Sequence, residues 1–362
     1  MTVTVRSFAK INLGLRIGAA RGDGFHELLT VYQTIGLHDV IRVSVGRGSG
    51  IEIRCDHPRV PRDESNTCYR IVEKALAVLH AKRRVVIEIE KRLPVQGGLG
   101  GASANAVATI LGLERALPKS LTSAERLRIA AEVGSDLPLF LVGGTVLGVG
   151  RGEQVYPLPD FPAMACVVVT PELGVSTPKA FAAWDRLYGA GAREAEPPKP
   201  AAVQIRKGRP AELGLAGQPG TAEPPQAIAK LTELKSSDRM SELGRGLSAW
   251  LSGLYSGAPS GFTERRGRAE NPLLALVRAG IENDFERVVF PEYPELSEGK
   301  TALLRAGAKY ASLSGSGSTL YGLFGSRESA KLGVTRLAKQ GWAAQATGTL
   351  PRRAYWKRVV AE

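Results

Sequence analysis

The chain reads Pro94-Val95-Gln96-Gly97-Gly98-Leu99-Gly100-Gly101-Ala102-Ser103-Ala104-Asn105 between a strand-like run at 85–90 and a helix-like run at 104–113. Four glycines within five residues let the backbone turn tightly and bring its N–H groups close to a ligand. The segment leads into a helix N-terminus, where free N–H groups and the helix dipole favour an anion. This pattern predicts a loop that binds nucleotide phosphates. A glycine-rich turn without a ligand remains the alternative at this point.

The residues after the glycines exclude two other kinds of phosphate-binding loop. A Walker A loop needs Lys-Ser or Lys-Thr directly after its last glycine. Here Gly101 is followed by Ala102-Ser103, and the next lysine is Lys119. A dinucleotide fingerprint needs a third small residue at a set spacing and an acidic residue on the next strand. The residues that follow the helix-like run, 118–121, do not form such a strand.

Length and composition indicate a globular protein of two lobes. The chain has 362 residues, of which 43% are hydrophobic and 23% charged, enough for a large core. No apolar run has the length of a membrane span, and residues 1–6 lack a signal-peptide core, so we expect a cytoplasmic protein. The cysteines and histidines show no metal-ligand spacing, so we predict no protein metal site; they are Cys55, Cys68, Cys166, His26, His38, His57 and His80.

The net charge of +13 requires a basic surface. Such a surface attracts either nucleic acid or a polyanionic small substrate. The sequence shows no interleaving of aromatic and basic residues of the kind that recognises RNA. Charge alone does not separate the two alternatives.

Apolar periodicity predicts a mixture of strands and helices. Asn66 is placed to cap a helix that runs to His80, and the pattern from Thr122 to Glu125 predicts a capping box. Residues 142–158 are typical of a glycine-rich hairpin. The remaining predicted strands are 3–7, 11–17, 40–45, 51–53, 165–169, 320–324 and 342–349, and the remaining predicted helices are 124–132, 227–255, 272–288 and 326–339.

Residues 189–270 contain segments of a different composition. Proline-rich stretches at 197–200 and 219–225 favour loop or disorder, and 256–270 is typical of a surface loop. We expect a flexible insertion around 189–270.

Three motifs occur in the order found in the galactokinase, homoserine kinase, mevalonate kinase and phosphomevalonate kinase (GHMP kinase) superfamily. They are Ala9-Lys10-Ile11-Asn12-Leu13, the loop at 94–105, and Ser314-Gly315-Ser316-Gly317-Ser318. The doubled glycines of the loop, with Gly24-Phe25-His26-Glu27-Leu28 and Gly134-Ser135-Asp136-Leu137-Pro138, most resemble the branch that acts on a cytidine-diphosphate-linked methylerythritol. The resemblance covers most of the chain outside the insertion.

This resemblance implies a two-lobe α+β fold. Residues 1–163 would form the ATP-binding lobe, similar to domain 2 of ribosomal protein S5, and residues 164–362 a ferredoxin-like lobe with the insertion. The implied activity is transfer of phosphate from ATP, with Mg²⁺ accompanying the ATP, to the 2-hydroxyl of the methylerythritol in the non-mevalonate route to isoprenoid precursors. The implied partner is this small molecule, with no nucleic acid and no membrane.

The resemblance assigns catalysis to Lys10 and Asp136. A carboxylate at position 136 can accept the hydroxyl proton or orient the hydroxyl. A partly buried Lys10 would keep that carboxylate ionised and offset charge on the transferred phosphoryl group. The structural alternatives are a helix N-cap for Asp136, with Pro138 just inside the helix, and a solvated strand lysine for Lys10.

The resemblance also assigns substrate contacts. Two aromatic rings would clamp the cytosine, Phe25 and Phe181, and His26 would hydrogen-bond its edge. Thr177 and Asn12 would line the site of the substrate. The rings could equally fill a core.

The nucleotide would contact the loop at 94–105 and two asparagines, Asn66 and Asn105, each of which could equally be a cap. The third glycine loop comprises Ser314, Gly315, Ser316 and Gly317. Relatives usually carry two serines after the loop glycines, but Ser103 is followed here by Ala104, so one hydroxyl is missing and the resemblance does not assign a second hydroxyl contact to phosphate or Mg²⁺. Two other functions remain open: a GHMP-type kinase for a small alcohol such as homoserine or mevalonate, and an RNA-binding protein on the same fold. The retained Lys10 and Asp136 favour a kinase.

Overall fold

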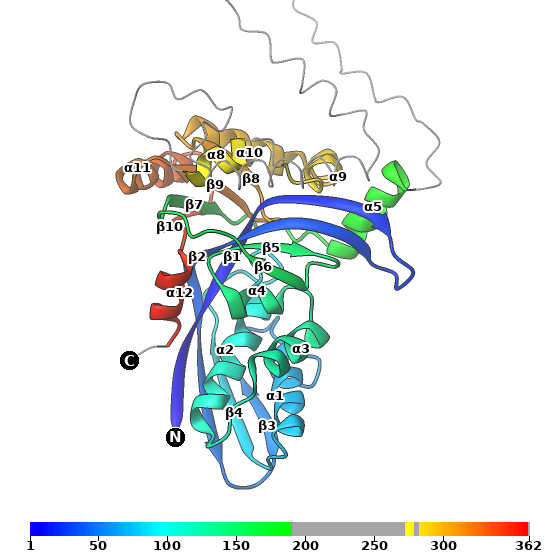
Figure 1. Ribbon diagram of the computed structural model, residues 1–362. Helices are drawn as coiled ribbons and strands as arrows, with labels where there is room; N and C mark the ends of the chain where they lie inside the picture. The colour runs from blue at the N-terminus through cyan, green and yellow to red at the C-terminus, as the bar shows by residue number, and fades with distance from the viewer. Residues whose placement is uncertain (190–271, 279–281, 361–362) are drawn as a thin grey trace, which may run out of the picture.

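A computed structural model describes residues 1–189, 272–278 and 282–360. Within these ranges the chain builds two antiparallel-rich sheets, each covered by helices, one below the other in Figure 1. The predicted insertion at 189–270 and the predicted helix at 227–255 lie outside the described residues, apart from Gly189. The division at residue 163 stays a prediction.

The first sheet is built around one long hairpin. Its strands β1 (Thr2–Ala20) and β2 (His26–Gly46) pair antiparallel from Thr2↔Ser44 to Ala20↔His26. The runs predicted at 3–7 and 11–17 therefore belong to a single strand. Every residue of β1 from Ser7 to Gly18 is buried. Both faces of this stretch are covered, because the hairpin extends beyond the first lobe and packs under the second, where Leu15 and Ile17 join its core (Figure 1).

Four further strands complete this sheet in the order β3-β4-β2-β5-β6, with β1 beside β2. The predicted hairpin at 142–158 is confirmed, since β5 and β6 pair antiparallel from Val146↔Pro157 to Val149↔Gln154. The strands are β3 (Gly50–Arg54), β4 (Arg84–Glu90), β5 (Thr145–Val149) and β6 (Gln154–Pro157).

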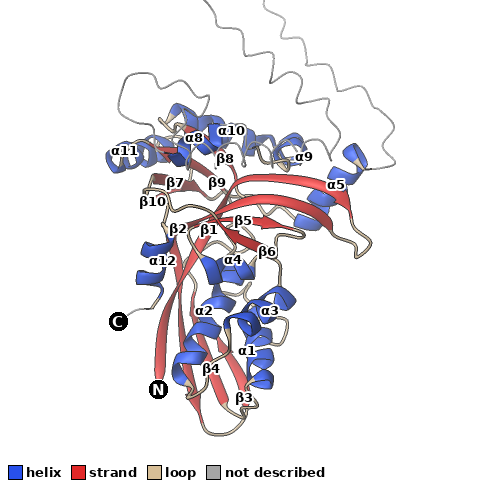
Figure 2. Cartoon of the chain, viewed as in Figure 1, coloured by secondary structure: helices blue, strands red, loops and turns tan. Residues whose placement is uncertain are grey.

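Helices of the first lobe cover one face of this sheet (Figure 2). The predicted caps are confirmed: the Asn66 side chain accepts a hydrogen bond from Cys68 N, and Thr122 and Glu125 form a capping box. These bonds satisfy N–H groups that a helix leaves free in its first turn. The helices are α1 (Thr67–Val78), α2 (Gly101–Ala116), α3 (Ser123–Val133) and α4 (Leu137–Val142).

The second sheet has the order β10-β7-β9-β8, and helices cover it on the side away from the first lobe (Figure 1). Its strands are β7 (Ala165–Val169), β8 (Tyr310–Leu313), β9 (Leu320–Phe324) and β10 (Ala344–Gly348). Its helices are α5 (Thr177–Tyr188), α8 (Pro272–Arg278), α9 (Glu286–Glu292), α10 (Pro294–Arg305) and α11 (Arg327–Ala338).

The helix predicted at 272–288 is wrong as one continuous element. The backbone of Glu282 and Asp284 bonds to Leu15 of β1, at 2.9 Å and 2.8 Å, so this stretch crosses to the hairpin instead of continuing α8. A backbone that bonds to a neighbouring strand cannot also form the helical i to i−4 bonds.

The last helix, α12 (Arg352–Val359), returns to the first lobe. The Tyr355 hydroxyl donates to Phe140 O at 2.7 Å, and its ring lies 5.8 Å from that of Phe8. The C-terminal end of the described chain therefore packs beside the N-terminal strand.

Candidate active site

Three segments that are distant in the sequence meet at the glycine loop. Lys10 N of β1 donates to Leu99 O at 3.0 Å, and Thr319 N donates to Gly97 O at 3.2 Å. The Ser314 hydroxyl donates to Gly98 O at 3.0 Å. The loop is thus held through its carbonyl groups by the two other predicted motifs.

The opposite side of the loop leaves its N–H groups free. Within the described residues, none of the N–H groups from Gly98 to Ser103 donates a hydrogen bond to the protein. Gly100, in the left-handed conformation at φ 69°, is the N-cap of α2, so the loop runs directly into the helix N-terminus. Converging free N–H groups at a helix N-terminus form an anion site.

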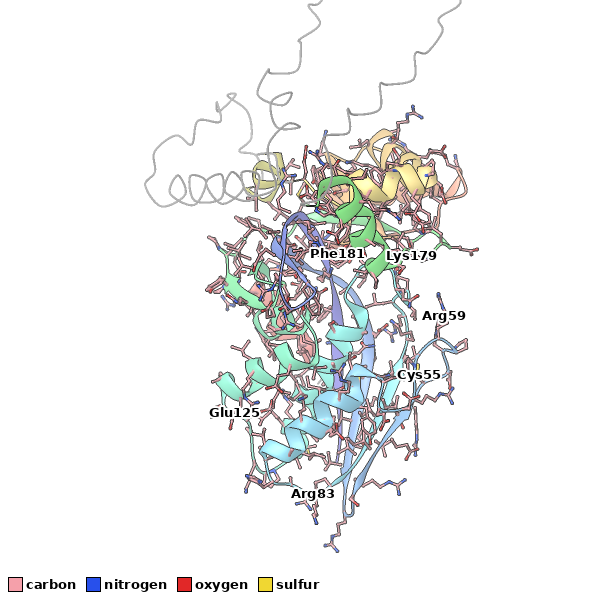
Figure 3. The ribbon with its side chains drawn as sticks, turned by 90° about the vertical axis from the view of Figure 1, so that its right-hand side faces the viewer. Cys55, Arg59, Arg83, Glu125, Lys179 and Phe181 are labelled. Carbon is pink, nitrogen blue, oxygen red and sulfur yellow. The ribbon has the colours of Figure 1, made fainter. Side chains whose placement is uncertain are left out.

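A cavity of about 330 Å³ opens onto this loop. Its wall contains Asn66, Asn105 and every predicted loop residue except Ala104, which packs in the core. Sequence reasoning missed the rest of the wall, which comes from the β3–α1 connection and the end of β4: Arg59, Val60, Pro61, Ser65, Thr67, Ile89 and Lys91. No motif marks these residues, and Arg59 lies on the exposed side of the lobe (Figure 3).

Both predicted asparagines use their side chains within the protein. Asn66 is the N-cap of α1, as the alternative interpretation held, and its amide donates to Pro61 O at 2.7 Å. Asn105 donates to Asp39 at 3.0 Å and accepts from Ser7 at 2.6 Å. A direct contact of either residue with a nucleotide stays a prediction.

Close packing between two glycine loops yields a first prediction. A Cβ at Gly98, where φ is +76°, would lie 2.1 Å from Ser314 O. We expect Gly98→Ala to displace the loop, to cost about 1–3 kcal/mol of stability, and to weaken ATP binding. Thermal melting and ATP titration measure both effects. Gly341→Ala is the matched control, since φ is +84° there but nothing lies within 4 Å; equal effects from the two variants would contradict the steric argument.

Lys10 and Asp136 lie together beside the loop. The distance from Lys10 Nζ to Asp136 Oδ2 is 3.5 Å, with side-chain exposures of 4% and 36%. Lys10 Nζ also donates to Asn12 Oδ1 at 2.6 Å, and Asn12 Nδ2 donates to Thr30 at 2.8 Å. The structure therefore excludes a solvated strand lysine at position 10.

The Asp136 side chain does not cap the helix that it precedes. Asp136 occupies the N-cap position of α4, but its carboxylate makes no capping hydrogen bond. Instead Oδ1 accepts a hydrogen bond from the Tyr32 hydroxyl at 3.1 Å. Burial, and then the nearby Asp136 carboxylate, raise the pKa of Tyr32 well above its usual value, so the hydroxyl remains a donor at neutral pH. Asp136 is thereby oriented from two sides.

Two glycines border the Lys10 side chain, Gly100 of the loop at 94–105 and Gly315 of the loop at 314–317. A Cβ at Gly100 would lie 3.1 Å from Lys10 Cγ, and a Cβ at Gly315 would lie 3.6 Å from Lys10 Nζ. Both glycine loops therefore lie against the lysine side chain. Tyr32 was missed because its role depends on this packing, and a buried tyrosine in an alternating strand is usually part of the core.

The predicted aromatic residues meet differently from the expected clamp. His26 stacks on Phe181, with centroids 4.9 Å apart and planes 11° from parallel, while Phe285 meets Phe181 edge-on at 5.0 Å. Phe181 lies on the side of α5 toward the β1–β2 hairpin, whereas Lys179 points away (Figure 3). Phe25 is 49% exposed, and the Arg151 guanidinium lies 4.9 Å from its ring.

Two further contacts join the predicted substrate-binding residues to other elements. His26 Nε2 lies 2.7 Å from Asp185 Oδ1 of α5, a partner that sequence reasoning missed. The Thr177 hydroxyl lies 2.7 Å from that of Ser316, so α5 begins against the third glycine loop. Both contacts join segments more than a hundred residues apart, which no local pattern reveals.

Two features are absent from the described ranges. They contain no cluster of three or more His, Cys, Asp or Glu side chains suited to hold a metal ion. None of the helices found there has the length and apolar character needed to cross a membrane.

Comparisons with known proteins agree with this geometry. Residues 66–144 match the GHMP kinases N terminal domain, and residues 269–342 match the GHMP kinases C terminal family. A 4-diphosphocytidyl-2-C-methyl-D-erythritol kinase of Acaryochloris marina is 32% identical over 92% of this chain and 91% of its own length. One of Solibacter usitatus is 32% identical over 99% and 93%.

Solved structures show the same architecture. A crystal structure of 4-(cytidine 5'-diphospho)-2C-methyl-D-erythritol kinase matches with a TM-score of 0.63 at 26% identity, covering 96% of this chain and 98% of that one. Homoserine kinase from Cytophaga hutchinsonii has the same fold, with a TM-score of 0.62 at 19% identity over 97% and 95%. The chain belongs to the GHMP kinase superfamily and, within it, to the 4-diphosphocytidyl-2-C-methyl-D-erythritol kinase family.

Proposed function

We propose that this protein transfers the γ-phosphate of ATP to the 2-hydroxyl of 4-diphosphocytidyl-2-C-methyl-D-erythritol, giving the 2-phosphate and ADP. The observation that carries the proposal is the Lys10–Asp136 pair, 3.5 Å apart, beside a loop with free N–H groups. Phosphoryl transfer needs a hydroxyl to be oriented and phosphate charge to be offset. The pair and the loop supply these two functions.

Each group has a defined part in the transfer. The loop N–H groups bind the ATP phosphates, and Asp136 orients the substrate hydroxyl and accepts its proton as the new O–P bond forms. The bond from the γ-phosphorus to the bridging oxygen breaks, and ADP leaves with that oxygen. Lys10, held by Asn12, stabilises the negative charge of the transferred group throughout.

Mg²⁺ supplies further charge neutralisation when it is bound with ATP. The cavity wall contains no carboxylate among the described residues; hydroxyl oxygens there come from Ser65, Thr67 and Ser103. Such a wall fits a metal held mainly by phosphate oxygens and water, and Ser103, in the first turn of α2, would offer it the side-chain hydroxyl of the loop itself.

The substrate end of the site supports a cytidine-linked substrate over a small aliphatic alcohol. This end contains the rings of His26 and Phe181, which stack on each other and are held by Asp185 and Phe285. Aromatic faces stack with a pyrimidine, whereas homoserine or mevalonate has no ring to stack. The clamp of Phe25 and Phe181 stays a prediction, and the ring of His26 lies against one face of Phe181.

We expect Phe181→Ala and Phe25→Ala each to raise KM for the cytidine substrate while KM for ATP stays near the wild-type value. Loss of a stacked ring costs about 1–3 kcal/mol of binding. Steady-state kinetics with each substrate varied in turn measures this split. Trp356→Ala, which removes a 37% exposed ring on α12, is the control. If the variants only melt earlier and keep both KM values, the rings are core filling.

A kinase assay with a panel of acceptors tests the proposed function. The panel contains the cytidine-linked methylerythritol, free methylerythritol, homoserine and mevalonate, with ATP and Mg²⁺. We expect turnover of the cytidine-linked compound alone. Phosphorylation of homoserine or mevalonate, with no phosphorylation of the cytidine-linked compound, would assign another GHMP kinase activity. Salt-dependent RNA binding by a protein without kinase activity would support the remaining alternative.

A further inference from the structure

A carboxylate outside the described catalytic pair is fully buried under the glycine loop. Asp39 of β2 has no exposed surface. Its Oδ1 accepts hydrogen bonds from Arg92 N and Leu93 N, both at 2.7 Å. Its Oδ2 accepts from Lys91 Nζ at 2.6 Å and Asn105 Nδ2 at 3.0 Å. Each carboxylate oxygen therefore has two donors, and the 7% exposed Lys91 side chain provides the countercharge.

The four donors lie on both sides of the glycine loop. Lys91, Arg92 and Leu93 follow β4 directly and precede Pro94, where the loop begins. Asn105 lies in the first turns of α2, just after the loop ends. A single carboxylate thus binds the entry and the exit of the loop.

Neighbouring contacts fix this connection further. The Ser7 hydroxyl donates to Asn105 Oδ1 at 2.6 Å, which orients the amide toward Asp39. Ser7 and Asp39 face each other in the β1–β2 register. Lys91 forms part of the cavity wall, and its Nζ lies 3.5 Å from the place of a Cβ on Gly101. The network therefore reaches from the hairpin to the start of α2.

We propose that Asp39 is a positioning residue for ATP: it holds both ends of the phosphate loop so that the N–H groups from Gly98 to Ser103 converge on the phosphates. This inference rests on the proposed ATP-dependent function. Free N–H groups bind an anion well only when the backbone presents them in one fixed geometry, and small displacements weaken binding and transfer. Buried carboxylates with complete hydrogen bonding provide that rigidity.

Asp39→Asn is the decisive substitution because it is nearly isosteric. An amide at position 39 places an NH₂ group against two of the four donors in either orientation, so two hydrogen bonds are lost. We expect the Kd for MgATP, measured by calorimetry well below the melting temperature, to rise about tenfold or more. KM for ATP should rise in parallel, while KM for the cytidine substrate stays within about twofold of wild type.

Glu114→Gln is the matched control on the same helix. Glu114 is 8% exposed, accepts from Leu121 N at 2.8 Å and pairs with Arg126 at 2.9 Å, but it lies at the far end of α2. The Glu114→Gln substitution should lower the melting temperature and leave MgATP binding unchanged. Equal MgATP affinity in Asp39→Asn and wild type, with only a lower melting temperature, overturns the proposal, as does an equal rise in both KM values.

Ser7→Ala keeps the proposal testable if Asp39→Asn does not fold. Without the Ser7 hydroxyl, Asn105 is less firmly directed at Asp39, so MgATP affinity should fall by a smaller factor; unchanged affinity contradicts the proposal.

MgATP binding is measured without the second substrate. A wild-type protein that binds MgATP but does not phosphorylate the cytidine compound therefore refutes the proposed acceptor and leaves the role of Asp39 to be decided by the variants.

Discussion

Asp136→Asn is expected to fold and bind ATP normally and to lose roughly two to four orders of magnitude in kcat. An amide cannot accept the hydroxyl proton, although it can keep the shape of the side chain. The hydrogen bond from Tyr32 and the neighbouring Lys10 keep position 136 in place, so the loss should come from chemistry and not from misfolding. Single-turnover kinetics at saturating ATP and acceptor measures the effect.

Asp160→Asn is the control for this variant. Asp160 has the same 36% side-chain exposure and lies 3.6 Å from the Arg352 guanidinium. Its carboxylate accepts a hydrogen bond from the backbone N–H of Arg352 at the start of α12, and it has no proposed contact with a substrate. It should leave kcat within about twofold of wild type while it lowers stability slightly. Near-normal turnover in a well-folded Asp136→Asn protein would remove Asp136 from the mechanism.

Lys10→Met is expected to lower kcat by roughly 10²–10³-fold, since one charged donor to the transition state is lost. Methionine retains the aliphatic stem that passes Gly100, so the packing of the loop should survive. The ammonium group that lies between Asn12 and Asp136 is absent in this variant. Rapid-quench measurement of the transfer step, with ATP affinity determined separately, distinguishes loss of chemistry from loss of binding.

Lys300→Met provides the comparison, because Lys300 of the other lobe has the same kinds of partner, although its side chain is 30% exposed against 4% for Lys10. Lys300 pairs with Glu286 at 2.6 Å and lies 5.7 Å from the Phe290 ring, as Lys10 pairs with Asp136 and lies 5.6 Å from Tyr32. The Lys300→Met substitution should lower the melting temperature without a comparable loss in kcat. Similar losses from both substitutions would indicate that Lys10 acts through folding.

Local patterns in the sequence were sufficient for the loop, the caps and most elements. The strand at 84–90, the turn at the glycines and helix α2 follow from short-range backbone preferences, which glycine and apolar periodicity report directly. The capping box at Thr122–Glu125 and the N-cap at Asn66 are likewise local hydrogen bonds. The three motifs together also indicated the superfamily, which the comparisons confirm.

The tertiary structure alone decided which of these groups face one another. The sequence could not show that Asp136 contacts Tyr32 and Lys10 in place of capping α4, nor that Asn105 points to Asp39. These outcomes depend on packing between segments far apart in the chain, where differences of a few tenths of an ångström determine whether a hydrogen bond forms. Sequence periodicity specifies which face of a strand is buried, but only the close packing of two lobes around the β1–β2 hairpin specifies what each buried polar group bonds to.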